Sequence, residues 1–380
     1  MKSEFCEKMG IEFPLFAFTH CRDVVAGVSS AGGFGVLGAT GHNAQSLEIE
    51  LKWIDEHCNG KPYGVDLLVP NNMDSKEEAA ASAEIEARIP EEHKRYIESV
   101  LARHQIDTSG LWDRKIGDHI GDNMREKGAG PVLDVAFSHP QCQLIVNALG
   151  VPPDFMFEKA KAAGVRTGAL AGAKRHAIKH AEAGVDIIIT SGTEAGGHCG
   201  EVATMVLVPE VIGALAESGY DIPVLAAGGI VTGRQMAACM TMGAVGAWTG
   251  SVWLTTAEAE TAPVVKAKML LANSRQTVRS RSRTGKFTRQ LQSAWTDAWH
   301  SEEAPDPLPM PLQQLISEPA LGRVGQLAEG GHEGAKQLAT YFVGQGVGLM
   351  NAPTSTRQVV YDFMEDFAGA TERLAAFTEE

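Results

Sequence analysis

The segment from Ile187 to Gly200 joins an apolar run to residues that could carry out chemistry. Three isoleucines and a threonine lead into Ser191, four glycines, Glu194 and His198. Glycine lets a backbone approach a flat or phosphorylated ligand closely, and histidine is well suited to proton transfer near neutral pH. The segment therefore predicts a buried strand that delivers His198 into a glycine-lined opening, with Glu194 bracing the loop.

Two later segments predict a phosphate site. Residues 223–230 form an apolar run that ends in Ala-Ala-Gly-Gly, and Thr232 follows as the N-cap of a helix. Residues 244–251 end in the same way, in Gly-Ser. Exposed backbone N–H groups after the last two strands of an α/β barrel form a phosphate cradle. These turns therefore predict a cradle of that kind.

A third glycine pattern, residues 33–38, matches G-x-G-x-x-G. A dinucleotide fingerprint needs a strand before it and a helix that begins within it. Here a helix precedes the glycines and Val36-Leu37 is itself typical of a strand. We therefore interpret the pattern as a helix end that enters a buried strand.

Apolar runs alternate with amphipathic, alanine-rich segments along the chain, which is the pattern of βα units. Eight such units favour a closed TIM (β/α)8 barrel, whose active site lies at the C-terminal ends of its strands. An open doubly wound sheet is the alternative. The predicted strands are residues 11–17, 34–37, 63–69, 132–137, 166–170, 185–190, 222–226 and 244–249, and a helix is predicted at 141–149.

Two regions do not follow the repeat. We expect the barrel to span residues 1–255, with a polar insertion at 71–130 after the third strand that contains a helix at 91–103. That helical insertion is either a lid over the catalytic end or a peripheral decoration. Residues 256–380 are expected to form a mainly helical C-terminal part packed on the barrel.

Composition narrows the class of protein. The chain has 380 residues, 44% of them hydrophobic, and a formal net charge of −14. Nucleic acid and anionic membrane are therefore not expected as partners. The one basic stretch, residues 275–289, is either a solvated loop or a contact for an anion or substrate phosphate.

Targeting and metal-binding patterns are not found in the sequence. No apolar run approaches the roughly 20 residues that a membrane span needs, and the first ten residues lack the apolar core of a signal peptide. The six cysteines are scattered without C-x-x-C spacing, so neither a metal site nor a disulfide framework is expected. We expect a cytoplasmic protein, and a homo-oligomer is possible.

The chain resembles the nitronate monooxygenase family, formerly called 2-nitropropane dioxygenases, which are FMN-dependent barrels. The resemblance is carried by Gly192-x-Glu194-Ala-Gly-Gly-His198-x-Gly200, followed by Ala-Ala-Gly-Gly-Ile at 226–230. It covers most of residues 11–255 outside the insertion and continues weakly through 282–286 and 343–346. It implies FMN as the cofactor and a small-molecule nitronate or nitroalkane as the substrate, oxidised with O2 to a carbonyl compound and nitrite.

The resemblance also implies roles for single residues. His198 corresponds to the family histidine near the reactive face of the flavin, as a base or as a hydrogen-bond donor. The implied cofactor contacts are Phe18, Thr19, Asp66, Ser191, Gly192, Gly196, Gly197, Gly228, Gly229, Trp248, Thr249, Gly250 and Ser251.

The chain departs from the family pattern at several positions. Asp66 stands where the family has asparagine, and an ionised aspartate accepts hydrogen bonds but cannot donate them. Ser191 stands where the family has glutamine. Thr19-His20 replaces a Pro-Met pair, which makes His20 either a second candidate for site chemistry or a surface histidine. These changes weaken the transfer of nitronate specificity to this chain.

Two other functions stay open. One is a reductase on the same fold that uses NAD(P)H as electron donor and acts on an enoyl-thioester or a quinone; the insertion and the basic stretch would suit a bulky phosphate-bearing substrate. The other is a flavin-binding protein without turnover. Reduction of the flavin by NAD(P)H without oxygen distinguishes the reductase from the monooxygenase.

Overall fold

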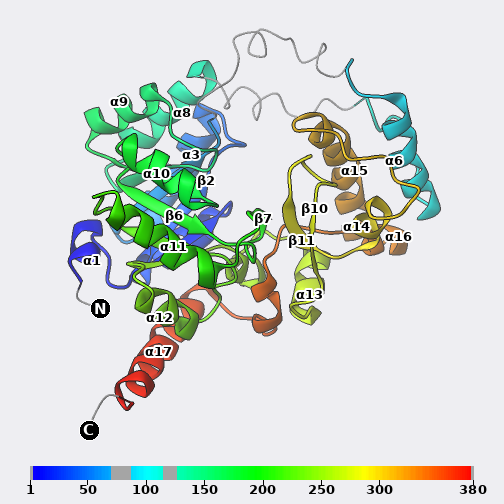
Figure 1. The fold of residues 1–380 in the computed structure, drawn as a ribbon. Coiled ribbons are helices and arrows are strands. Elements are labelled where there is room, and N and C mark those ends of the chain that lie inside the picture. Colours follow the sequence, from blue (N-terminus) through cyan, green and yellow to red (C-terminus); the bar gives the residue numbers. More distant parts are fainter. Residues whose placement is uncertain (1–2, 70–86, 114–125, 378–380) are drawn as a thin grey trace.

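A computed structural model describes residues 3–69, 87–113 and 126–377 of the chain. Eight parallel strands close into a barrel in the order β1-β2-β3-β4-β5-β6-β8-β9 (Figure 1). The prediction of a TIM barrel is therefore confirmed, and the open sheet is excluded. The barrel strands are β1 (Leu15–Thr19), β2 (Phe34–Gly38), β3 (Tyr63–Leu67), β4 (Cys142–Asn147), β5 (Arg166–Ala171), β6 (Ile187–Ser191), β8 (Val224–Ala227) and β9 (Gly246–Thr249).

The predicted position of the fourth strand is wrong. Residues 132–137 lie in helix α8 (Glu126–Ser138), and the predicted helix at 141–149 is strand β4. In α8, Ala129, Val132, Leu133 and Ala136 share one buried face that packs against helix α3 (Ala44–His57). A short apolar run fits a buried helix as well as a strand that is covered on both faces, so periodicity alone could not separate them.

Side chains alternate between the inside of the barrel and the helices around it. Phe16, Phe34, Leu144 and Ile189 belong to one buried cluster inside the barrel, whereas alternate residues such as Val65 pack against the outer helices. With a period of two, the inward positions nearest the C-terminal ends of four strands are Phe18, Asp66, Ser191 and Trp248.

Helices cover the outside of the barrel and make up most of the C-terminal part. Among the described helices, none combines the length and the apolar character needed to cross a bilayer. Besides α3 and α8 they are α1 (Glu4–Met9), α2 (Arg22–Ser30), α6 (Glu91–Arg103), α9 (Asp154–Ala163), α10 (Lys174–Glu182), α11 (Thr204–Glu217), α12 (Gly233–Thr241), η1 (Ser251–Thr255), α13 (Pro263–Leu271), α14 (Ala294–Trp299), α15 (Leu312–Glu329), α16 (Glu333–Leu338), η2 (Gln345–Leu349) and α17 (Thr356–Ala375).

Residues 87–113 of the insertion pack on the C-terminal region, whereas residues 126–130 begin α8 on the barrel. Helix α6 packs against α15 (Figure 1), Tyr96 donates a hydrogen bond to the carbonyl of Ala298 at 2.5 Å, and its ring meets Trp299 edge-on. The remainder of the predicted insertion, 71–86 and 114–125, lies outside the described residues. The last helix, α17, returns to the barrel and packs on α12 and α2.

The basic stretch contains a β-hairpin, so the alternative of a solvated loop is wrong, and the alternative of a contact for an anion or substrate phosphate stays a prediction. Strands β10 (Thr277–Ser280) and β11 (Thr288–Leu291) pair antiparallel, and β7 (Gly197–His198) adds a third strand on the β11 side. Arg283 forms an ion pair with Glu318 at 2.8 Å, and Arg289 donates to the carbonyl of Thr193 at 2.8 Å. The hairpin therefore joins the C-terminal part to the loop that follows β6.

Candidate functional site

Three chain segments meet at the C-terminal ends of β6 and β8 because glycines leave room for them. Gly228 has a φ of 110° and Gly229 a φ of 71°, in the region that L side chains rarely adopt. A Cβ on Gly228 would lie 2.5 Å from Thr204 Oγ1, and a Cβ on Gly192 would lie 2.5 Å from Thr204 N. Any side chain at either glycine would separate the β6 loop, the β8 turn and the start of α11.

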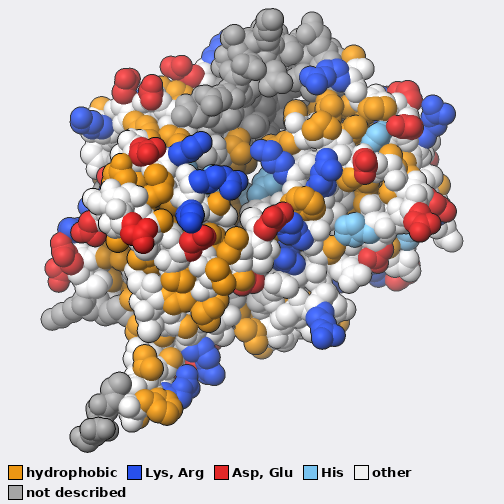
Figure 2. Space-filling view, viewed as in Figure 1, with side chains coloured by type: hydrophobic (Ala, Val, Ile, Leu, Met, Phe, Trp, Pro, Cys, Tyr) orange, Lys and Arg blue, Asp and Glu red, His pale blue; other side chains and the backbone are white. Residues whose placement is uncertain are grey.

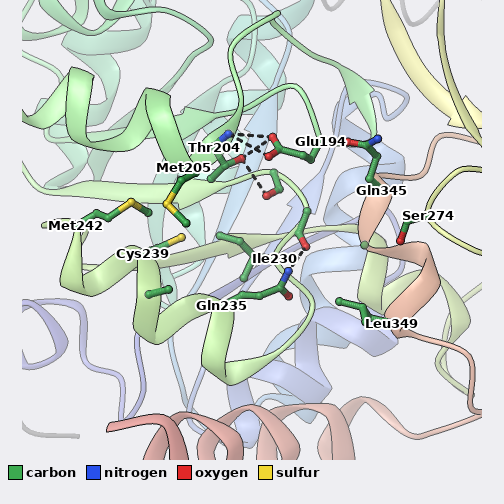
Figure 3. A pocket seen from close by; sticks show the side chains of 14 residues that line it. Glu194, Thr204, Met205, Ile230, Gln235, Cys239, Met242, Ser274, Gln345 and Leu349 are labelled. Carbon is green, nitrogen blue, oxygen red and sulfur yellow. Dashed lines mark hydrogen bonds between the residues drawn. The ribbon is translucent and has the colours of Figure 1, made fainter. Parts of the chain in front are cut away.

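Thr204 and Glu194 hold this junction together. The backbone N–H and the hydroxyl of Thr204 each approach Glu194 Oε2 at 2.9 Å, and Figure 3 shows the two side chains facing each other. The hydroxyl also lies 3.1 Å from the carbonyl of Gly228. Glu194 therefore braces the glycine loop against the N-terminus of α11, as the sequence led us to expect, whereas the partner residue Thr204 was not predicted.

The turns after β8 and β9 offer free hydrogen-bond donors. Among the described residues, the N–H groups of Gly229 and Gly250 have no acceptor, and a Cβ on Gly250 would meet nothing within 4 Å. Thr232 caps α12 together with Gln235, as predicted. Open space beside unused N–H groups at two neighbouring strand ends fits the phosphate of a mononucleotide.

Three of the predicted hydroxyl contacts have partners inside the protein. Thr249 donates to the carbonyl of Phe16 at 2.8 Å and accepts from Trp253 Nε1. Thr19 accepts from the N–H of Cys21 at the start of α2. Ser251 Oγ accepts from the N–H of Gly344 at 2.8 Å. The structure therefore places these three residues beside the strand ends, with hydroxyl groups that already hold the local backbone.

The inward side chains at the mouth form an aromatic and polar floor. Phe18 and Trp248 lie nearly parallel, with ring centroids 6.1 Å apart. Asp66 is 3% exposed, and its Oδ2 has no hydrogen-bond partner among the described residues. Burial raises the pKa of Asp66 well above its ordinary value. Together with Ser191, these groups fit one face of a flat ring system that also carries polar atoms.

His198 lies on β7 at the edge of the small sheet, paired with Thr288. Its Nε2 is 2.9 Å from Thr284 Oγ1. Burial by the surrounding protein, and secondarily the charge of Lys286, lower the pKa of His198 to about 4. The side chain is exposed to solvent, and with this lowered pKa the imidazole is neutral near pH 7.

Residues 343–346 close the site from the C-terminal part. The N–H of Gln345 donates to the carbonyl of Glu194 at 2.9 Å. A Cβ on Gly196 would lie 2.8 Å from Gly344 N, and a Cβ on Gly346 would lie 2.9 Å from the carbonyl of Gly229. We call residues 343–346 the glycine clasp. It contacts both the β6 loop and the β8 turn.

A pocket of about 410 Å³ lies on the outer side of the Gly228–Gly229 turn (Figure 3). Its wall is formed by the start of α11, by α12 and by η2, so it borders the helices rather than the barrel interior. The lining residues are Glu194, Thr204, Met205, Gly228, Gly229, Ile230, Gln235, Ala238, Cys239, Met242, Ser274, Gln345, Gly346 and Leu349.

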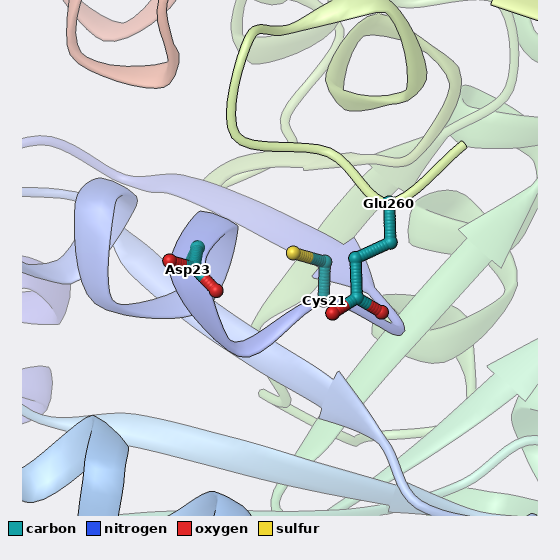
Figure 4. A group of neighbouring side chains, drawn as sticks. All are labelled: Cys21, Asp23 and Glu260. Atoms are coloured by element: carbon teal, nitrogen blue, oxygen red, sulfur yellow. The ribbon is translucent and has the colours of Figure 1, made fainter. Parts of the chain in front are cut away.

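Within the part of the chain that the structure describes, one group of side chains at the start of α2 has the spacing of metal ligands. Cys21, Asp23 and Glu260 approach one another there (Figure 4). The Cys21 thiol donates to the carbonyl of Glu258, and burial raises its pKa. A protonated thiol is not a metal ligand, so this group gives no support for a metal site.

Comparisons with known proteins agree with this arrangement. The family model described as nitronate monooxygenase matches residues 2–366. A Mycobacterium tuberculosis protein named as a monooxygenase is 51% identical over 385 residues, with 100% of both chains covered. A Staphylococcus aureus protein named as a nitronate monooxygenase is 26% identical over 83% of this chain and 85% of its own.

Solved structures share the fold. A nitroalkane oxidase from Streptomyces ansochromogenes superimposes with a TM-score of 0.78 at 24% identity, covering 97% of this chain and 99% of its own. FabK from Thermotoga maritima gives a TM-score of 0.69 at 22% identity, covering 99% of each chain. With the match along almost the whole chain, the protein belongs to the nitronate monooxygenase family and is a flavin-dependent oxidoreductase.

Proposed function

We propose that the protein binds FMN across the barrel mouth and oxidises a nitronate, or the parent nitroalkane, with O2 to a carbonyl compound and nitrite. The observation that carries the proposal is the glycine-lined loop after β6, which lies against the β8 turn with its unused N–H group and leads on to His198. When bound, FMN would accept the electrons and react with oxygen.

The residues present fit that cofactor. The N–H groups of Gly229 and Gly250 would hold the phosphate, with Gly228 allowing the close turn. Phe18, Ser191 and Trp248 would support the ring from inside the barrel. Gly192, Gly196 and Gly197 would let the β6 loop approach the ring without a side chain in between. The contacts of Thr19, Asp66, Thr249 and Ser251 would complete the site.

His198 would manage the proton at the reacting carbon. The Thr284 hydroxyl has one hydrogen, and it donates that hydrogen to the carbonyl of Lys286 at 3.2 Å. Its oxygen then accepts from His198 Nε2–H, which leaves Nδ1 with the lone pair. A neutral nitroalkane would lose its α-proton to Nδ1. A substrate already present as the anion would instead be oriented by His198 and attracted by the nearby Lys286.

The test begins with the purified protein loaded with FMN. Aerobic addition of the nitronate of nitroethane should release nitrite and consume oxygen, and anaerobic NADPH should leave the flavin oxidised. Rapid reduction by NADPH, with no nitrite from the nitronate, would instead establish the reductase.

Two variants separate the roles of the histidine. His198→Gln should lower kcat/KM for neutral nitroethane at least about a hundredfold, the usual scale of general base catalysis, and should affect its nitronate much less. Thr284→Val should reduce the same ratio more mildly, because the imidazole stays but loses its partner. Equal losses on both substrates in His198→Gln would refute the role as base.

A further inference from the structure

Two polar side chains lie at the mouth at the ends of β1 and β3, on the side of the rim that continues from β9 through β1 and β2. His20 follows β1, and its imidazole lies over Gly38 of β2. A Cβ on Gly38 would come within 2.5 Å of both Nδ1 and Cε1 of that ring. The ring also packs edge-on against Phe18, with centroids 5.2 Å apart. His20 is exposed to solvent on its remaining side, so the ring is fixed by Gly38 and Phe18 and still accessible to a ligand.

Asp66 occupies the next position around the rim. Gly38 pairs with Asp66 in the parallel register of β2 and β3. Paired residues in neighbouring strands point to the same face and lie about 5 Å apart. A Cβ on Gly64, two residues earlier, would contact Phe34 and Leu144 inside the barrel. Asp66 therefore also points inward, and the space over Gly38 that His20 fills adjoins it.

Hydrogen bonding fixes what each group can offer a ligand. His20 Nδ1 is 3.1 Å from the carbonyl of Gly38. A carbonyl only accepts, so Nδ1 carries the hydrogen and Nε2 of the neutral ring has a lone pair. Burial first, and the charge of His42 further, lower the pKa of His20, against a smaller opposing effect of the bond to Gly38. His20 is therefore a neutral acceptor.

Asp66 offers a ligand a hydrogen-bond donor, whereas His20 offers an acceptor. Oδ2 is enclosed and has no partner among the described residues, and no donor or cation holds the carboxyl group there. Its pKa is raised by burial alone. A carboxyl group in such surroundings takes up a proton and then carries one O–H donor. This corrects the expectation that Asp66 only accepts, since the protonated acid donates as asparagine would.

We propose that His20 and Asp66 together recognise the imide edge of the flavin ring. Nε2 of His20 accepts the ring N3–H, and the carboxylic acid of Asp66 donates to an adjacent ring carbonyl. The imide edge presents a carbonyl acceptor, the N3–H donor and a second carbonyl acceptor in a row. The neutral acceptor of His20 complements the N3–H, and the neutral donor of Asp66 complements a carbonyl beside it. The inference rests on the proposed flavin site and adds how this chain holds the ring where its sequence departs from the family.

The test measures binding rather than turnover. Apoprotein is titrated with FMN and with 3-methyl-FMN, which lacks the N3–H, and dissociation constants are read from flavin fluorescence. The wild type should bind 3-methyl-FMN about ten- to a hundredfold more weakly, the scale of one well-placed hydrogen bond. His20→Leu should bind FMN more weakly and lose most of that discrimination.

Substitutions of Asp66 test the donor. Asp66→Asn keeps an N–H donor and should bind FMN within about threefold of the wild type. Asp66→Leu removes it and should weaken binding about tenfold. His57→Leu, on the exposed side of α3, is the matched control and should leave both flavins unaffected. Near-ultraviolet circular dichroism checks that each variant is folded.

The outcomes separate the two proposals. A wild type that takes up no FMN would remove the proposed function and this inference with it. Tight FMN binding with equal affinity for 3-methyl-FMN would overturn the inference alone. Unchanged FMN affinity and discrimination in His20→Leu, with loss of turnover only, would also overturn it and would assign His20 to the substrate.

Discussion

Gly344 offers a sharp test of whether the glycine clasp holds the site together. Its backbone, with φ −81° and ψ 171°, suits any residue, so alanine would meet no conformational penalty. Its Cβ, however, would lie 2.5 Å from the carbonyl oxygen of Glu194 and 3.3 Å from Ser251 Oγ. Both neighbours are held by hydrogen bonds, from Gln345 N and Gly344 N respectively, so the clasp must move away.

The magnitude follows from these contacts. Forcing a methyl group into packed surroundings costs about 1–3 kcal/mol, and each weakened hydrogen bond adds about 0.5–1.5 kcal/mol. Gly344→Ala should therefore lower the free energy of unfolding by about 2–6 kcal/mol, or weaken FMN binding if the clasp alone opens. Gly369→Ala is the control. It lies within helix α17 with nothing within 4 Å of its Cβ, and it should stabilise by about 0.5–1 kcal/mol.

The assay is urea unfolding of both variants with and without FMN, together with the FMN dissociation constant. Both variants carry the same Gly→Ala substitution, so opposite changes in the free energy of unfolding isolate the effect of the contacts at Gly344. A Gly344→Ala protein as stable as the wild type, with the same FMN affinity, would refute the view that residues 343–346 hold the β6 loop in place.

Three further predictions concern single side chains. Thr204→Val should lower the free energy of unfolding in urea by about 1–3 kcal/mol, because the carboxylate of Glu194 loses a hydrogen-bond donor. The control Thr241→Val removes a hydroxyl that bonds only within its own helix and should change that free energy little. Equal losses in the two variants would contradict the prediction. For neutral nitroethane, kcat/KM should fall on the acid side only as the pH approaches about 4, the lowered pKa of His198. Lys286→Gln should move this fall to a higher pH, because the nearby positive charge is removed. A fall centred at pH 6.5 in the wild type would contradict a neutral histidine. Asp66→Asn should stabilise the apoprotein increasingly at higher pH. The pKa of Asp66 in the folded protein is raised above 3.8, so the wild type loses up to about 1.4 kcal/mol of stability per pH unit above 3.8 until the folded group ionises. If the unfolding free energies of the wild type and Asp66→Asn ran parallel from pH 5 to about 8, the raised pKa would be disproved.

Much of the fold could be predicted because its pattern is local. Each βα unit carries an apolar run, a turn and an amphipathic helix within about thirty residues, so the closed barrel follows from counting units. The wrong prediction around β4 shows where a local pattern is not sufficient to assign an element. The runs at 132–137 and Cys142–Asn147 are both short and apolar, and only packing against α3 decides which of them is the helix.

The sequence could propose candidate site residues where one strand end gathers several glycines and polar residues, as around His198 and Gly228. It could not indicate them where the partners are distant in the sequence. Thr284 meets His198 across 86 positions, and Gly344 meets Ser251 across 93. Nothing near Thr284 or Gly344 in the sequence indicates these contacts, because they depend on the β10–β11 hairpin and the clasp returning to the barrel.

The raised pKa of Asp66 was also beyond the sequence. The residue type alone predicts an anion, and only its position in the apolar rim, without a cation or donor beside it, reverses that expectation. The position of His20 was also beyond the sequence, because its ring packs over Gly38 of the next strand, where a side chain would leave no room for it.

The central claim is that this site binds FMN for the oxidation of nitronates. The most direct measurement mixes the FMN-loaded protein anaerobically with the nitronate of nitroethane, and separately with NADPH, and records the flavin absorbance. The account predicts that the oxidised-flavin band bleaches with the nitronate and persists with NADPH. Bleaching by NADPH alone, or a band that the nitronate leaves unchanged, would contradict it.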